Sequence, residues 1–207
     1  MMLWAAAGLA VAGAYLLGAI PSGYLAGRLL KGVDIRTLGS RSTGATNVLR
    51  TLGPWPALAV FAVDLAKGAA AVLLAGASTA PLPAGAGPWI VCLAGLAALL
   101  GHSRSIFLGF TGGKSAAAGL GVLLAMSWPV GLGAAGVFAA GVAISRVVSL
   151  SSMLAAVAAA ALVLVLPHPA AYRLLVVAGA AFVIWLHRAN IGRLLSGTEP
   201  RVSLGRR

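Results

Sequence analysis

Residues 116–144 decide how often the chain crosses a membrane: they read AAAGLGVLLAMSWPVGLGAAGVFAAGVAI and contain no charged residue. As one helix the stretch would be roughly 44 Å long, which exceeds the roughly 30 Å hydrocarbon core of a bilayer. As two helices it divides at Trp128-Pro129, because proline does not continue a preceding helix. The first interpretation gives six spans for the whole chain, and the second gives seven.

The rest of the chain is equally apolar, with 60% hydrophobic and 9% charged residues among 207. Soluble proteins carry about 25% charged residues, so the sequence has too little charge to cover a solvated surface. The first apolar run, residues 3–20, lacks the basic segment of a cleaved signal peptide, and we expect a retained span. The other runs are residues 54–76, 88–101, 116–128, 130–144, 150–166 and 172–187.

The positions of the basic residues favour seven spans. With seven spans and the N-terminus outside, all but two of the 15 Lys and Arg residues fall in cytoplasmic segments; the exceptions are Arg173 and Lys67. Six spans would separate the arginines of residues 188–207 from the basic residues of 28–114. Because cytoplasmic loops are enriched in Lys and Arg, the sequence predicts an all-α integral membrane protein with seven transmembrane helices, two of them short around Pro129, and a cytoplasmic C-terminus.

This topology gives a single membrane domain, residues 1–207, with three polar loops on the cytoplasmic face at about 28–53, 102–115 and 188–207. In the first loop, Gly39 and Gly44 let the backbone turn its N–H groups toward a ligand, and arginine binds an oxyanion with two hydrogen bonds. Such a loop suits a phosphate better than a neutral ligand. The alternative is a solvated loop that needs glycine for its turns and arginine for topology.

The second loop ends in Gly112-Gly113-Lys114-Ser115, directly before an apolar helix. A helix N-terminus offers free amides and a positive dipole end to an anion, although this tetrapeptide lacks the preceding strand of a Walker A loop. In the third loop, His187 and Asn190 lie three residues apart, on one helical face. Glu199 is the only acid of the arginine-rich tail, and we expect it in a structural salt bridge rather than as a base.

Several classes of site are excluded or disfavoured. The single cysteine, Cys92, excludes an intrachain disulfide and a cysteine-based zinc site. Asp34, Asp64 and Glu199 are the only acids and lie far apart, so we expect neither a metal nor a cofactor. Few aromatics and no basic soluble domain argue against nucleic acid as a partner. Asp64 and Lys67, within a predicted span, are either a neutralised packing pair or functional.

Four motifs, in order and over nearly the whole chain, resemble the PlsY family of bacterial acyl-phosphate-dependent glycerol-3-phosphate acyltransferases. They are Gly18–Leu25, Asp34–Arg50, Gly101–Lys114 and His187–Pro200. The resemblance implies transfer of a fatty acyl group from acyl phosphate to glycerol 3-phosphate in phospholipid biosynthesis, giving 1-acylglycerol 3-phosphate and phosphate. It also implies a multi-pass protein of the bacterial inner membrane, in contact with membrane lipids, with a cytoplasmic site and functional coupling to an enzyme that produces acyl phosphate.

Carried over by motif, the resemblance implies catalytic roles for Ser40, Arg50 and His187 and a structural role for Glu199. The chain departs from the family pattern at Arg41-Ser42, where Gly-Asn is usual, at Ser105, where proline is usual, and at Ser115, where glycine is usual. Either His187 or the substrate's own phosphate takes the proton of the attacking hydroxyl. The implied substrate-binding residues are Gly39, Ser42, Thr46, Asn47, Gly112, Gly113, Lys114 and Asn190.

Two other classes of protein fit parts of the sequence. A non-enzymatic membrane transporter of an anion or a lipid phosphate would bind phosphate in the same loops without turnover, but the chain shows no internal repeat of the kind found in many transporters. A purely structural membrane subunit leaves the density of phosphate donors in the loops unexplained. The sequence gives neither the acyl-chain preference nor the oligomeric state.

Overall fold

The computed structural model describes residues 2–79, 82–83 and 85–202, and within these ranges it contains helices and no β-strand, apart from one isolated bridge between Ser105 and Thr111. Two short 3₁₀ turns, η1 (Ile35–Thr37) and η2 (Ile106–Leu108), lie in the polar loops. The α-helices are α1 (Met2–Ala19), α2 (Ser22–Lys31), α3 (Ala45–Leu52), α4 (Pro54–Ala77), α5 (Ala86–Ser103), α6 (Ala116–Met126), α7 (Trp128–Ser145), α8 (Val148–Val165), α9 (Ala170–Leu186) and α10 (Arg188–Leu195).

The apolar helices identify a membrane protein. Five stretches are long and apolar enough to cross a bilayer, the first made of α1 and α2 together, and the bent pair α9–α10 is a sixth. The remaining apolar helix, α6, has only 11 residues. The division of residues 116–144 into two helices is confirmed: α6 ends at Met126, and Pro129 lies in the first turn of α7, where its missing N–H breaks no hydrogen bond. The prediction that both helices are short is wrong for α7, which begins at Trp128 and continues to Ser145 and is therefore long enough to span a bilayer.

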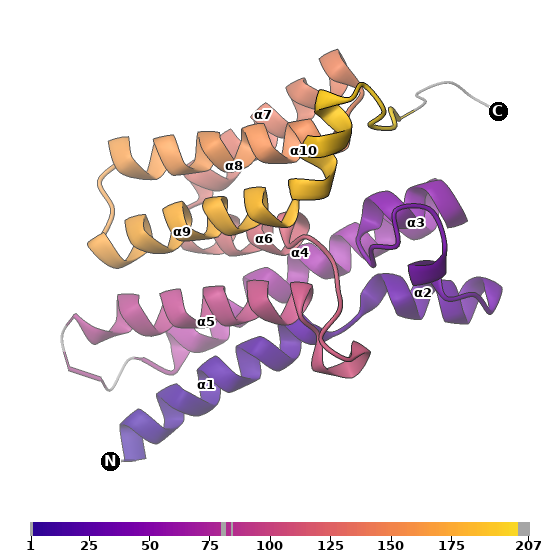
Figure 1. Cartoon of the computed structure of the whole chain (residues 1–207). Coiled ribbons are helices and arrows are strands. Elements are labelled where there is room, and N and C mark those ends of the chain that lie inside the picture. The colour runs from indigo at the N-terminus through magenta and orange to yellow at the C-terminus, as the bar shows by residue number, and fades with distance from the viewer. Residues whose placement is uncertain (1, 80–81, 84, 203–207) are drawn as a thin grey trace.

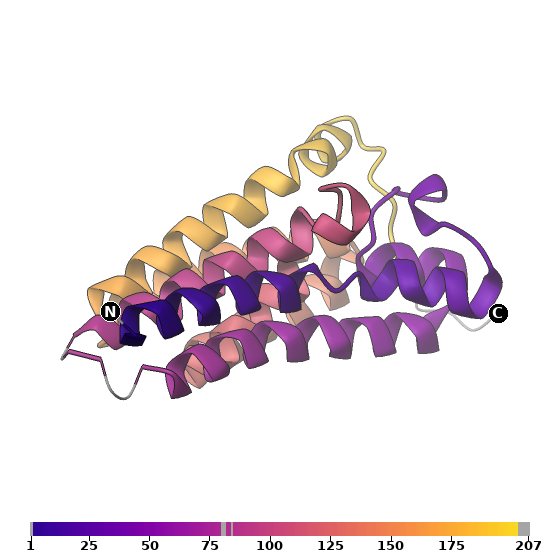
Figure 2. The same ribbon diagram turned by 90° about the horizontal axis from the view of Figure 1, so that it is seen from below.

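The helices lie side by side, and their connections gather at two ends (Figures 1 and 2). One end holds the start of α1, the α4–α5 connection and the α8–α9 connection. The α6–α7 break lies at the same end, because Ser127 Oγ is 3.0 Å from His168 Nε2. The other end, which we call the motif end, holds α2, α3, the segment 104–115 and α10.

Charge separates these two ends as the sequence predicts. Arg173, in the first turn of α9, lies at the opposite end, and Lys67 lies within α4. Arg206 and Arg207 lie outside the described residues. The basic residues of the motif end lie on its helices, in its loops, at the α7–α8 turn that contacts the tail, or in the tail after α10: Arg28, Lys31, Arg36, Arg41, Arg50, Arg104, Lys114, Arg146, Arg188, Arg193 and Arg201.

The short helix α6 creates a recess in the bundle. It packs tightly on α4, since a Cβ on Gly121 would lie 1.9 Å from the carbonyl oxygen of Leu65. Small residues of this kind let membrane helices approach closely. Because α6 has 11 residues and α7 has 18, α6 falls roughly 10 Å short of the length of α7. The start of α6 is therefore further from the motif end than the α7–α8 turn, and this leaves space between the start of α6 and the motif end.

Candidate functional site

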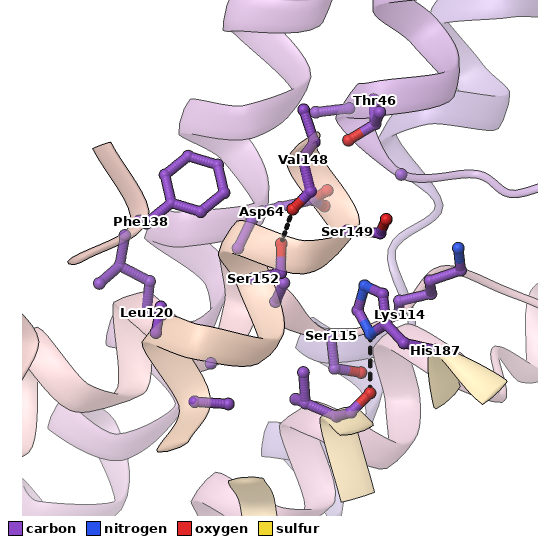
Figure 3. Close-up of a pocket in the computed structure, with 18 of the residues that line it drawn as sticks. Thr46, Asp64, Lys114, Ser115, Leu120, Phe138, Val148, Ser149, Ser152 and His187 are labelled. Atoms are coloured by element: carbon purple, nitrogen blue, oxygen red, sulfur yellow. Dashed lines mark hydrogen bonds between the residues drawn. The ribbon is translucent and has the colours of Figure 1, made fainter. Parts of the chain in front are cut away.

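A cavity of about 190 Å³ occupies this recess and is lined by residues of α3, α4, α5, α6, α7, α8, α9 and α10. One part of its wall is apolar, with Leu120 and Phe138 among the residues drawn in Figure 3. The other part carries donors from all three predicted loops. The polar lining residues are Ser40, Ser42, Thr46, Asn47, Arg50, Asp64, His102, Lys114, Ser115, Ser149, Ser152, His187, Asn190 and Glu199.

Two helix N-termini border the cavity. Residues 44–46, at the start of α3, and residues 115–117, at the start of α6, all line it. The first turn of a helix has N–H groups without intrahelical partners and the positive end of the helix dipole. The α6 terminus was expected from the sequence. The α3 terminus was not, because the sequence predicts a single loop over residues 28–53. Together the two termini make the polar wall attractive to anions.

Asn47 organises the first loop. Its amide Nδ2 donates to the carbonyl oxygens of Ile35, Leu38 and Ser42, at 2.9–3.2 Å, and its Oδ1 accepts from the Ser40 N–H at 2.9 Å. The side chain is 1% exposed. These four bonds fold the loop so that the side chains of Ser40 and Ser42 face the cavity. In this structure Asn47 shapes the binding loop through its side chain.

Gly39 also shapes the first loop, and it does not line the cavity. Its φ is +54°, and a Cβ there would lie 2.4 Å from Asn47 Oδ1. A side chain at this position would therefore displace the amide that holds the loop together.

A hydrogen-bond network joins the second and third loops. Lys114 Nζ donates to Oδ1 of Asn190, whose Nδ2 donates to Glu199 Oε1 at 2.6 Å. Glu199 also accepts from Ser149 Oγ at 2.7 Å and pairs through Oε2 with Arg193 Nε at 2.7 Å. The expected salt bridge of Glu199 is confirmed. Burial of the Glu199 carboxyl raises its pKa, but the hydrogen bonds from Asn190, Ser149 and Arg193 outweigh this, and the net pKa is lowered.

Lys114 lies in a positively charged surrounding. Burial lowers its pKa most, and the nearby charges of Arg193 and Arg50 lower it further, while Glu199 raises it; the result is a pKa of about 8. An unfavourable concentration of positive charge of this kind is relieved when an anion binds between the groups. The polar wall is thus charged for a dianionic ligand.

Two further site residues are fixed by backbone contacts. Arg50, in the last turn of α3, donates from Nη2 to the carbonyl oxygen of Pro200 at 3.3 Å, which connects the first loop to the third. His187 lies between α9 and α10, and its Nδ1 donates to the Val183 carbonyl at 2.7 Å. In the neutral ring this leaves Nε2 as an acceptor.

The predicted glycines of the second loop lie differently from the other site residues. Neither Gly112 nor Gly113 lines the cavity, and the Gly113 N–H already donates to the His102 carbonyl at 3.0 Å. Gly113 therefore has no free amide for an anion in this structure. Of the implied site residues, those that do line the cavity are Ser40, Ser42, Thr46, Asn47, Arg50, Lys114, His187, Asn190 and Glu199.

Two cavity residues, Ser149 and Ser152, were not among the site residues predicted from the sequence. Ser149 and Ser152 lie in the first turns of α8, three residues apart. The sequence feature that could have identified them is the pair of serines, three residues apart, that follows Arg146. Asp64 and His102 also line the cavity. Asp64 forms an ion pair with Lys67, as expected for the neutralised pair that the sequence left open as one alternative to a functional role. Among the described residues, no three His, Cys, Asp or Glu side chains cluster as metal ligands.

Comparison with known proteins identifies the family to which the chain belongs. A family model described as glycerol-3-phosphate acyltransferase matches residues 8–197. A protein of Rhizobium johnstonii named glycerol-3-phosphate acyltransferase 2 is 61% identical over 98% of both chains. A protein of a Synechococcus species named glycerol-3-phosphate acyltransferase is 55% identical, over 98% of this chain and 96% of the relative.

Two solved structures are similar along nearly the whole chain. Both are crystal structures of PlsY (YgiH), an integral membrane glycerol 3-phosphate acyltransferase. The glycerol 3-phosphate form gives a TM-score of 0.88 at 39% identity, covering 95% of this chain and 96% of that one. The lysophosphatidic acid form gives a TM-score of 0.86 at 38% identity, covering 95% of both chains.

Proposed function

We propose a reaction for the chain from the premise that it belongs to the glycerol-3-phosphate acyltransferase family, whose model matches residues 8–197. The chain transfers a fatty acyl group from acyl phosphate to glycerol 3-phosphate and releases 1-acylglycerol 3-phosphate and phosphate, as a step of phospholipid biosynthesis. The observation that carries this proposal is the cavity itself. It joins a wall of phosphate donors to an apolar wall inside a membrane bundle, which matches a substrate with a phosphate and a fatty chain.

The donors divide into two groups, one for each phosphate. Lys114, Asn190 and His187 hold glycerol 3-phosphate. Lys114 and Asn190 join the start of α6 to α10 by their hydrogen bond, and His187 lines the same cavity. Ser40 and Arg50 hold the phosphoryl group of acyl phosphate, with Ser42 and Thr46 beside them at the start of α3. Gly39 and Asn47 shape this first group, and Gly112 and Gly113 place Lys114 in the second.

The chemistry needs few parts from the protein, because acyl phosphate is already an activated donor. The hydroxyl oxygen of glycerol 3-phosphate attacks the acyl carbon, the bond from that carbon to the phosphate oxygen breaks, and phosphate leaves with the electron pair. Positioning of the two substrates and stabilisation of the growing charge on the leaving phosphate are the main contributions. The phosphate of the acceptor takes the hydroxyl proton, and His187 positions this substrate.

The same proposal sets the topology. All seven apolar helices cross the membrane as a single domain over residues 1–207, with the N-terminus outside and the motif end in the cytoplasm of a bacterial cell, at the inner membrane. An enzyme that produces acyl phosphate supplies the donor from that side. The concentration of Lys and Arg at the motif end supports this orientation.

Cysteine labelling on a Cys92→Ala background tests the topology, with single cysteines at Lys31, Arg104, Arg146 and Arg193. We expect all four to be protected from an impermeant reagent in intact cells and to react in inverted vesicles. Labelling of the Arg146 position from outside, with the others labelled from inside, would overturn the seven-span arrangement.

The activity is tested with the purified chain, acyl phosphate and isotope-labelled glycerol 3-phosphate, by following label in the lipid-soluble product. We expect 1-acylglycerol 3-phosphate with acyl phosphate as donor and little with an acyl thioester. A transporter would bind the labelled compound in the same cavity and yield no acylated product.

A further inference from the structure

A buried charged cluster lies at the junction of three segments, on the inner side of the cavity. Asp64 and Lys67 belong to α4 and are 1% and 6% exposed. Asp64 Oδ1 lies 2.8 Å from Lys67 Nζ and accepts from Ser22 Oγ at 2.6 Å. Lys67 Nζ also donates to the Ile20 carbonyl at 2.8 Å, so the pair fastens α4 to the break between α1 and α2.

His102 on α5 is the third residue of the cluster and connects the Asp64–Lys67 pair to the second loop. Its Nδ1 lies 3.6 Å from Asp64 Oδ1, and the ring is buried. A Cβ on Gly113 would lie 2.1 Å from His102 Nε2, so the ring fills the space in which a side chain at position 113 would stand. The His102 carbonyl accepts the Gly113 N–H at 3.0 Å.

Lys114 follows directly, and its other neighbour is anchored on the same helix. Ser115 Oγ donates to the Leu99 carbonyl at 2.7 Å, and Ser115 has a left-handed backbone with φ of +58°. The backbone on both sides of Lys114 is therefore fixed to the last turns of α5. The His102 ring packs against Gly113, so we expect a shift of this ring to move Gly113 and, with it, the Lys114 ammonium.

A packing role alone does not account for the cluster. Asp64 Oδ2 and His102 Nδ1 are both buried and have no hydrogen-bond partner in the described part of the chain, although both residues line the cavity. Lys67 neutralises Asp64 without any histidine, and charge within a membrane span is expensive to keep. The Asp64 carboxylate lies beside the His102 ring, with Oδ1 3.6 Å from Nδ1, and its negative charge favours the ring orientation in which Nδ1 faces Asp64.

We propose that Asp64, acting through His102, is a positioning residue that sets Gly113 and Lys114 for glycerol 3-phosphate. The inference rests on the proposed function for the identity of the phosphate ligand. It explains the Gly112-Gly113 pair by the packing of His102 beneath Gly113 rather than by amides offered to the substrate.

A double-mutant cycle tests this coupling. Asp64→Asn and Lys114→Ala are made singly and together, and kcat/KM for glycerol 3-phosphate is measured per folded enzyme. We expect Asp64→Asn to lower kcat/KM by about 10- to 100-fold, as small misplacements in an active site do. In the Lys114→Ala background the same change should alter kcat/KM less than about twofold, because its target is gone. Factors that simply multiply would overturn the proposal.

A second variant separates positioning from folding. Asp64→Asn leaves the Lys67 ammonium buried without its partner, which is strongly destabilising. Adding Lys67→Met removes that charge and should restore the thermal midpoint in detergent, while the defect in kcat/KM for glycerol 3-phosphate stays. Recovery of both the midpoint and the kinetics would mean that Asp64 only neutralises Lys67.

The control is Asp34→Asn, an Asp→Asn change at the same end of the bundle, where Asp34 pairs with Arg36 and does not line the cavity. It should leave kcat/KM within about twofold of wild type. Titration of the same proteins with inorganic phosphate measures the affinity of the Lys114 site for phosphate without acyl transfer. Phosphate affinity that falls in Asp64→Asn supports the coupling even if the wild type acylates another acceptor, and unchanged affinity contradicts it.

Discussion

Lys114 and Asn190 are joined by a direct hydrogen bond from Nζ to Oδ1, although 76 residues separate them. The bond closes the cavity between the start of α6 and α10, and Glu199 holds the far side of the Asn190 amide. The Lys114 ammonium, which we propose binds the phosphate of glycerol 3-phosphate, is thus positioned by two loops at once. Its charge state controls how well the site holds an anion.

Binding of glycerol 3-phosphate should weaken above pH 8. The pKa of Lys114 is lowered to about 8, by burial first and by Arg193 and Arg50, so the ammonium is present below that pH and is lost above it. We expect KM for glycerol 3-phosphate to rise between pH 8 and pH 9.5 in wild type. In Lys114→Arg the guanidinium stays charged, so KM should be higher at pH 7 but flat over the same range. A flat wild-type profile contradicts the assignment.

Arg50→Lys and Ser40→Ala should each lower kcat by about 10²–10³, the usual loss when one donor to a transition-state charge is removed. Arg50→Lys keeps the positive charge and removes the planar fork, so it separates a bidentate contact from topology. Arg28→Lys and Ser78→Ala are matched controls at residues that do not line the cavity. Near wild-type turnover in both test variants, with normal folding, would place the active site in another loop.

His187→Gln should retain residual activity, with a pH–rate profile of unchanged shape. In the proposed mechanism the phosphate of glycerol 3-phosphate takes the hydroxyl proton. His187, held by the Val183 carbonyl, only positions glycerol 3-phosphate. Initial rates between pH 5.5 and pH 9 check this. If the acidic limb of the profile disappears in the variant, His187 is the base.

Arg41→Gly should stabilise the protein, whereas Ser115→Gly should not. Both residues have left-handed backbones, with φ of +57° and +58°, which favour glycine. Arg41 is exposed, and removing its strain should gain about 1 kcal/mol, or about 2–4 °C in the midpoint. Ser115 would lose its bond to the Leu99 carbonyl, which offsets the gain. Thermal unfolding in detergent checks both, with Arg41→Ala as the control; a lower midpoint for Arg41→Gly contradicts this account.

The sequence predicted the parts of the molecule that depend on local pattern. Apolar runs of span length, the proline after Trp128 and the distribution of Lys and Arg placed the helices and gathered the three loops at one end. Ser40, Arg50, Lys114 and His187 do meet at one cavity.

Contacts between segments far apart in the chain were not accessible from pattern. The role of Asn47 depends on three carbonyls that only the folded loop brings together, and the role of Gly113 depends on a histidine on another element. Ser149 lines the cavity beside the short helix α6 and bonds to Glu199, which lies 50 residues further along the chain. The spacing of residues in the sequence does not show which residues of neighbouring helices lie at the same level in the bundle.

Release of inorganic phosphate by the purified chain is the most direct measurement of the central claim. With acyl phosphate and glycerol 3-phosphate both present, the account predicts steady release, matched one to one by 1-acylglycerol 3-phosphate and strongly reduced in Lys114→Ala. Absence of release, or release at the same rate without glycerol 3-phosphate, would contradict it.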